Sequence, residues 1–84
     1  MKKGDCFVYT ENDFIIIAKV NDVCDDFVYI TDIKVSLKEK DISRSSNVKL
    51  SLEFVEQFKP IQKEVFNKTD YMLSNIINYI KTEI

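Results

Sequence analysis

Residues 12–22, NDFIIIAKVND, contain a run of five consecutive apolar residues. A strand on the surface of a small domain usually alternates apolar and polar residues, because one face of the sheet is buried and the other is wet. Since side chains alternate across a strand, Ile15 and Ile17 make the start of its second face apolar as well. The first face is apolar throughout and consists of Phe14, Ile16, Ala18 and Val20. Another part of the chain must therefore cover the second face.

Three segments rich in β-branched and aromatic residues predict strands. They are residues 5–10 (DCFVYT), 13–18 (DFIIIA) and 26–31 (DFVYIT). Only Glu11 and Asn12 separate the first two, and an asparagine tolerates the positive φ that a tight hairpin needs. The polar stretch 21–25 separates the second from the third. Connections this short predict an antiparallel meander.

The third strand is also apolar on both faces at one end. On one face we expect Phe27, Tyr29, Thr31, Ile33 and Val35. On the other, Val28 and Ile30 precede Asp32 and Lys34, so we expect Val28 and Ile30 to join Ile15 and Ile17 on the face that needs a cover.

Residues 62–84 predict a helix that supplies this cover. They contain no Gly or Pro, and their apolar stripe has helical spacings of 7, 4, 3 and 4. The stripe consists of Phe66, Leu73, Ile77, Ile80 and Ile84. No other amphipathic segment is long enough, so we assign Phe66, Leu73 and their helical neighbours to the second face of the central strands.

Between strand and helix, residues 36–47 (SLKEKDISRSSN) are polar and end in a run that favours turns, so they predict the longest loop. We expect a short strand over residues 47–50. Ser51 is suited to cap a short helix that runs through Phe58, and this helix must end before Pro60.

These elements predict a single α+β domain of 84 residues. Residues 1–50 would form a bent antiparallel sheet of three to five strands, residues 51–61 a helical turn and connector, and residues 62–84 one long helix. Lys3-Gly4-Asp5 before the first strand, the strand lengths and the one long loop resemble, over residues 3–61, a small SH3-like barrel with an appended helix. The resemblance implies a binding module for peptides or nucleic acids, although fold does not determine function. The absence of Trp departs from the peptide-binding members.

The composition excludes most kinds of catalytic site. The chain has no His and a single Gly, Gly4, which removes the usual general base and the glycine-rich phosphate loop. Cys6 and Cys24 lack metal-site spacing and are expected to be reduced structural thiols. Residues 22–26 (DVCDD) lack the Gly and final Glu of a calcium loop. We therefore expect no catalytic residue, no metal and no cofactor, and a protein that is not an enzyme.

The apolar runs are far shorter than the roughly 20 residues of a membrane span. The start of the chain, MKKGD, does not lead into a signal-peptide core. We expect a cytoplasmic protein without membrane contact.

Two groups of residues are candidate contacts for a partner. The first is basic and would bind an anionic ligand, although a charged loop more often just keeps a surface wet. It consists of Lys38, Lys40, Arg44 and Lys49. The second is the far end of the helix, which at about 34 Å would extend beyond a strand of about 23 Å unless it crosses the sheet obliquely. It consists of Ile76, Ile77, Ile80 and Ile84.

We expect a non-enzymatic protein-interaction module, which binds a partner protein or a second copy of itself through an exposed sheet edge or the Ile-rich helix end. One alternative is a nucleic-acid-associated small barrel that uses the basic residues of the 38–49 loop, with exposed aromatic residues as a further contact. The net charge of −2 and the acidic first 33 residues oppose it. Another alternative is a small accessory or inhibitor protein from a mobile element.

Overall fold

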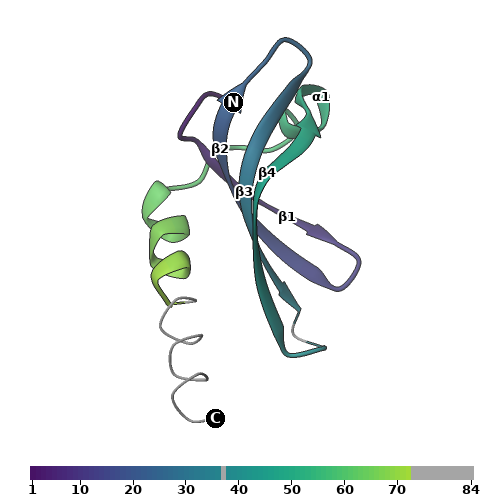
Figure 1. Cartoon of the computed structure of the whole chain (residues 1–84), viewed down its shortest axis with the longest axis vertical. Coiled ribbons are helices and arrows are strands. Elements are labelled where there is room, and N and C mark those ends of the chain that lie inside the picture. Colours follow the sequence, from purple (N-terminus) through teal and green to yellow (C-terminus); the bar gives the residue numbers. More distant parts are fainter. Residues whose placement is uncertain (37, 73–84) are drawn as a thin grey trace.

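The computed structural model of the chain describes residues 1–36 and 38–72 (Figure 1). Its main feature is a four-stranded antiparallel sheet in the order β1-β2-β3-β4, so strands that follow one another in sequence are neighbours in space. The labelled elements are β1 (Cys6–Glu11), β2 (Phe14–Val23), β3 (Phe27–Ser36), β4 (Asp41–Ser51) and α1 (Leu52–Val55). Residues 63–72 form a further helical segment. The predicted α+β class with an antiparallel meander is confirmed.

The finer predictions of a barrel and of one long helix are not confirmed. The sheet is open, with β1 and β4 as its two edges. The labelled helix α1 is only four residues long. Of the helix predicted over residues 62–84, the described part covers residues 63–72. Leu73 and the residues after it lie outside the described residues.

The first hairpin forms where the sequence predicts it. Glu11 pairs with Phe14, so the turn consists of Asn12 and Asp13 rather than Glu11 and Asn12. Asn12 has a φ of 55°, which is the positive value that a tight hairpin turn needs. The second hairpin is longer than predicted, because β2 continues to Val23 and only residues 24–26 connect it to β3.

One predicted face assignment is wrong. Val20 pairs with Ile30 and Ile17 pairs with Ile33, and directly paired residues point to the same side of a sheet. Val28 and Ile30 therefore lie on the face of Phe14, Ile16, Ala18 and Val20, which we call the inner face. The outer face carries Ile17, Ile33 and Val35. The composition of each strand did not reveal this, because the register between two strands decides which of their residues share a face.

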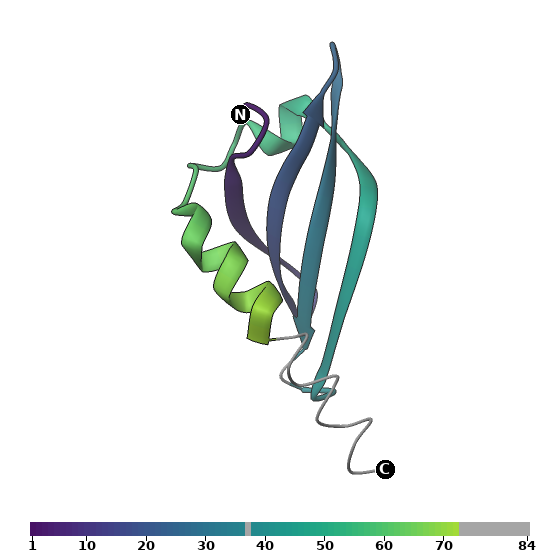
Figure 2. The same ribbon diagram turned by 60° about the vertical axis from the view of Figure 1, so that its left-hand side comes forward.

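Each face of the sheet has its own cover: in Figure 1 the 63–72 helix and α1 lie on opposite sides of β2 and β3, and Figure 2 shows the 63–72 helix running beside the sheet. The inner face packs against Val55 of α1 and against Phe54 and Phe58. The outer face packs against Phe66 of the 63–72 helix, whose side chain is only 4% exposed. The prediction that Phe66 covers the second face of β2 is confirmed, since Phe66 and Ile17 belong to the same apolar cluster.

The predicted loop over residues 36–47 is mostly strand. β4 begins at Asp41, and Arg44 pairs with Ile33 of β3. The polar side chains of this part of β4 are exposed, so they remain in water while the backbone pairs with β3. Pairing with a neighbouring strand outweighs the weak intrinsic preference of Ser and Asn for strands. Ahead of β4, residues 38–40 form a turn.

The predicted cap of the short helix is confirmed. The Ser51 hydroxyl accepts a hydrogen bond from the Phe54 N–H at 3.1 Å, and Glu53 lies in the first turn. The helix itself ends at Val55 rather than at Phe58.

Two irregularities bend the sheet. The register of β2 against β3 shifts between Val20 and Asp22, which leaves Asn21 as an extra residue. The register of β3 against β4 shifts beyond Ile30, and Asn47 in that part of β4 has a φ of 57°. Asn21 Nδ2 donates to Thr31 Oγ1 at 2.8 Å, which links the two sites. Because bulges increase twist and bend strands, they help the two edges of the sheet curl toward the same side.

Candidate functional site

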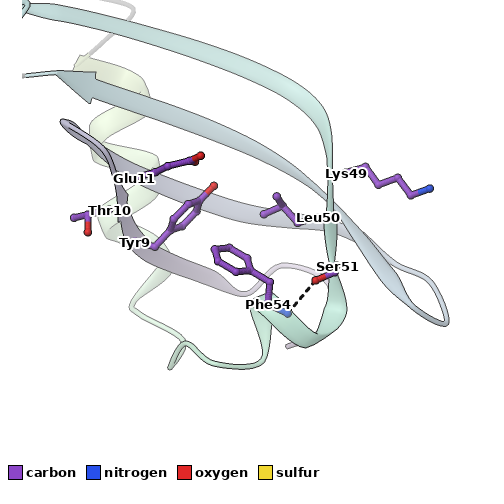
Figure 3. Close-up of a pocket in the computed structure, with 7 residues that line it drawn as sticks. All are labelled: Tyr9, Thr10, Glu11, Lys49, Leu50, Ser51 and Phe54. Atoms are coloured by element: carbon purple, nitrogen blue, oxygen red, sulfur yellow. Dashed lines mark hydrogen bonds between the residues drawn. The ribbon is translucent and has the colours of Figure 1, made fainter.

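A pocket of about 510 Å³ lies between the two edge strands. We call it the edge pocket. It is lined by Tyr9, Thr10 and Glu11 of β1, Lys49, Leu50 and Ser51 of β4, and Phe54 of α1. Figure 3 shows the side chains of Tyr9, Leu50 and Phe54 directed into the space between the strands, while that of Lys49 points away. Residues 40 positions apart in the sequence thus form one concave surface.

The floor of the pocket is a rigid aromatic cluster. The rings of Tyr9 and Phe54 meet edge to face with their centroids 5.3 Å apart. Phe58 contacts both rings, at 5.6 Å from Tyr9 and 5.2 Å from Phe54. Phe7 stacks on Phe58 at 5.6 Å. Such packing, together with the Ser51 cap on α1, holds Phe54 in place without a ligand.

The electrostatic environment of the pocket is acidic. Burial raises the pKa of the Tyr9 hydroxyl, and the nearby carboxylates of Asp32 and Glu11 raise that pKa further. The one lysine that lines the pocket does not offset them, because the Lys49 Nζ lies 4.1 Å from the centroid of the Phe27 ring, and Phe27 is on the outer face. The inner wall of the pocket therefore favours a positive charge.

Asp32 is an unexpected member of the inner face. It lies between Ala18 of β2 and Ser45 of β4 and is 1% exposed. Neither carboxylate oxygen makes a well-formed hydrogen bond with the described residues. Burial raises the pKa of Asp32, and the charge of Lys34 and the Ser45 backbone N–H lower it in part.

The outer edge of β1 presents unpaired backbone groups. The Val20 N–H donates to the Asp5 carbonyl at 2.8 Å, so the carbonyl of Asp5 points toward β2. Backbone groups alternate in direction along an antiparallel strand, and the next carbonyl, that of Cys6, points outward and accepts from the Ile61 N–H at 2.7 Å. By the same alternation, the N–H and C=O groups of Val8 and Thr10 point outward. Within the described residues, only Ile61 pairs with this edge.

The outer edge of β4 faces the same gap. The Leu52 N–H donates to the Asp26 carbonyl at 3.0 Å. The pairs that follow in this ladder are Ser51 with Phe27, Leu50 with Val28 and Lys49 with Tyr29. The alternation directs the backbone of Leu50 to β3 and that of Lys49 and Ser51 outward.

The structure does not bring the four predicted basic residues together. Lys38 and Lys40 lie in the turn before β4. The Arg44 Nε makes an ion pair of 2.9 Å with the Asp70 carboxylate, which ties β4 to the 63–72 helix. Lys49, which covers the Phe27 ring, is about 30 Å along the strand from Lys40 at 3.3 Å per residue. The isoleucines predicted to contact a partner, Ile76, Ile77, Ile80 and Ile84, lie outside the described residues.

The other features considered are the two cysteines, the acidic side chains and the helices. Cys6 and Cys24 are free thiols, and burial raises the pKa of Cys6. Residues 1–36 and 38–72 contain no cluster of acidic or cysteine side chains suited to a metal ion. No helix in that part of the chain has the length and apolar character needed to cross a membrane.

Sequence reasoning missed the edge pocket. Its residues come from three elements, and residues 36–47, much of which belongs to β4, were predicted to be a loop. The acidic charge of the first 33 residues was the only hint of the pocket's electrostatics. Comparison of the chain with models of protein families, with curated proteins and with solved structures finds no match.

Proposed function

We propose that this protein is a non-enzymatic interaction module that binds an extended segment of a partner protein as an added strand on the edge of β1. The observation that carries the proposal is the position of the edge pocket directly beside outward-pointing backbone groups. Exposed edges are templates for strand pairing. In this mode of recognition, main-chain hydrogen bonds supply affinity and a pocket for alternate side chains supplies specificity.

The chain itself already uses this edge in the proposed way. Ile61 makes an antiparallel bridge with Cys6, next to the groups of Val8 and Thr10 that remain open. An incoming segment can continue this ladder from Val8 to Thr10. Every second side chain of that segment would then point toward the inner face, where Tyr9, Leu50 and Phe54 form the pocket.

The charges support a protein partner over nucleic acid. A phosphate backbone requires several cations that act together. Here Arg44 is paired with Asp70, Lys49 lies over Phe27, and the pocket rim carries the acidic Glu11. No contact in the described part of the chain favours the basic-loop or mobile-element alternatives.

The proposal is tested by selecting binders from a library of displayed linear peptides and mapping them by amide chemical shifts. Selected peptides are expected to shift the amides of Val8, Tyr9, Thr10, Leu50 and Phe54. Thr10→Pro removes the outward N–H without removing a bond to β2, because proline is tolerated on an edge strand. We expect it to weaken peptide binding about tenfold or more, as loss of a buried hydrogen bond and of strand geometry implies.

Thr10→Val is the matched control, because it keeps the backbone N–H and should keep the affinity. Thermal unfolding of both variants establishes that they remain folded. The proposal is overturned if folded Thr10→Pro binds as the unchanged protein does, or if the selected peptides shift only amides of the outer face around Arg44.

A further inference from the structure

The edge pocket combines an aromatic floor with acidic surroundings, and this combination restricts what fits in it. Tyr9 and Phe54 present ring surface, Leu50 adds an aliphatic wall, and Glu11 lies at the rim (Figure 3). A wholly apolar side chain would satisfy the floor but leave the Glu11 carboxylate and the Tyr9 hydroxyl facing apolar atoms. Polar groups that lose water without gaining a partner oppose binding.

A long basic side chain satisfies both parts of the pocket. The methylene stems of Lys and Arg pack along apolar surface while their charged ends reach polar groups. A cation close to an aromatic ring face gains further attraction. The lysine that lines the pocket, Lys49, directs its charged end to the ring of Phe27 and leaves this position to a ligand.

We propose that the edge pocket receives a lysine or arginine side chain of the added strand, with its stem against Leu50 and Phe54 and its charged end at Glu11 and the Tyr9 hydroxyl. This inference rests on the proposed strand addition at β1 and names the side chain that the added strand carries. Two carboxylates contribute to the acidic surroundings of the pocket. Glu11 is exposed at the rim, whereas Asp32 is buried in the inner face and influences the same tyrosine.

The volume of the pocket is sufficient for a long side chain and its neighbouring backbone. At about 510 Å³ it lies within the range of roughly 300–1,000 Å³ that is typical of small-ligand sites. Because alternate residues of a strand point to opposite faces, the residues on either side of the basic one point away from the pocket. One basic residue in an otherwise neutral strand is therefore enough to test the idea.

The probes are five acetylated and amidated heptapeptides, STVXVTS, in which the central X is Lys, Arg, norleucine, Gln or Glu. Binding is measured by amide chemical-shift titration of the unmodified protein. We expect the Lys and Arg peptides to bind about tenfold tighter than the norleucine peptide, which has the stem without the charge. We expect the Glu peptide to be the weakest, and the advantage of Lys to decrease when salt is raised.

Variants of the protein locate the effect. Glu11→Gln is expected to reduce the Lys peptide to the affinity of the norleucine peptide. Asp25→Asn removes the same charge from the exposed β2–β3 connection, outside the pocket, and should preserve the preference for Lys. Thermal unfolding shows whether each variant is folded.

Failure of this inference and failure of the proposed function give different results. If all five peptides shift Val8 and Thr10 with equal affinity, or if norleucine is preferred, strand addition stands and the basic side chain is refuted. The same conclusion follows if the preference for Lys survives Glu11→Gln. If no peptide shifts the β1 and pocket amides, strand addition itself is refuted.

Discussion

Asp32 shows at the scale of a single residue how pairing in a sheet can bury a charge. Its position opposite Ala18 and Ser45 places it on the inner face, where neighbouring strands leave it 1% exposed. Burial without well-formed hydrogen bonds disfavours the charged form of a carboxylate. The residue therefore lowers the stability of the fold near neutral pH, while its charge makes the surroundings of the edge pocket more acidic.

Asp32→Asn is expected to raise the free energy of unfolding at pH 7 by about 1–2 kcal/mol, because it removes an incompletely solvated charge. The pKa of Asp32 is raised in the folded state above the ordinary value of 3.8. The folded state thus holds the proton more tightly, and stability falls as pH rises through the interval above that value. Urea unfolding at pH 7 and at about pH 4 should show that the advantage of the variant shrinks in acid.

Asp25→Asn, in the exposed connection between β2 and β3, is the charge-matched control and should show no comparable gain in stability at pH 7. A variant at position 32 that is less stable than the unchanged protein at pH 7 would mean that the carboxylate of Asp32 stabilises the fold.

At the scale of elements, two helical pieces are attached to the sheet by different means. The 63–72 helix is attached by Phe66, which packs into the cluster with Cys6 and Ile33, and by the ion pair between Arg44 and Asp70. The short helix α1 continues directly from β4 and depends on the Ser51 cap. Both helical pieces bury an apolar side chain against the sheet, Phe66 on the outer face and Val55 of α1 on the inner face, and α1 has in addition the hydrogen bond from the Phe54 N–H to the Ser51 hydroxyl.

Phe66→Ala is expected to destabilise the protein by about 3 kcal/mol, within the range for removing a large buried aromatic side chain. Val65→Ala, on the adjacent position of the same helix, is the control, because Val65 is 42% exposed. It should cost well under about 1 kcal/mol. Chemical unfolding of both variants measures the difference, and equal effects would show that this helix is not attached to the outer face through Phe66.

Ser51→Ala is expected to cost about 1 kcal/mol, because the Phe54 N–H loses its hydrogen-bond partner at the start of α1. Since Phe54 forms part of the edge pocket, the same change should also weaken peptide binding. Ser43→Ala, at an exposed position of β4, keeps α1 unchanged and should affect neither property. Unfolding and peptide titration can be measured on the same samples. A normal affinity in Ser51→Ala would mean that Phe54 keeps its place without the cap.

At the scale of the whole molecule, the essential property is that the sheet curls without closing. Its edges face a shared pocket, and within residues 1–36 and 38–72 the only strand-like pairing on an outer edge is the bridge between Cys6 and Ile61. A closed barrel would remove both edges. The difference can be observed residue by residue in the absence of any ligand.

Amide hydrogen exchange is expected to distinguish the open sheet from a barrel. In the open sheet, the outward N–H groups of Val8, Thr10 and Lys49 exchange with little protection. Those of Tyr9 and Leu50, which point to neighbouring strands, exchange much more slowly. Protection of all five amides in the free protein would indicate a closed barrel, or a second molecule already bound at the edges. Repeating the measurement over a range of protein concentrations separates these two cases.

Local pattern was sufficient for several parts of the fold. Richness in β-branched and aromatic residues predicted β2, and the alternation of side chains across a strand predicted its inner face. Asn12 predicted the tight turn, and Ser51 predicted the cap. Helical spacing placed Phe66 on the cover of the outer face. Each of these depends on residues close together in the sequence, whose conformational preferences are expressed locally.

Other parts depended on contacts between distant residues. The polar residues before Asn47 belong to β4 because they pair with β3. Val28 and Ile30 lie on the inner face rather than on the predicted outer face because of the register between β2 and β3. Local sequence pattern could not predict the edge pocket, because Tyr9, Leu50 and Phe54 meet only after two bulges have bent the sheet.

By itself, the sequence determined the class of the fold, the strands of its first half and the need for a cover on both faces of β2. These follow from side-chain periodicity and turn chemistry, which act over a few residues. Only the tertiary structure decided the length of β4, the burial of Asp32 and the acidic aromatic pocket between the two edges. The physical reason is that strand register and sheet curvature arise from backbone pairing between distant segments, and the same sequence pattern is compatible with more than one such pairing.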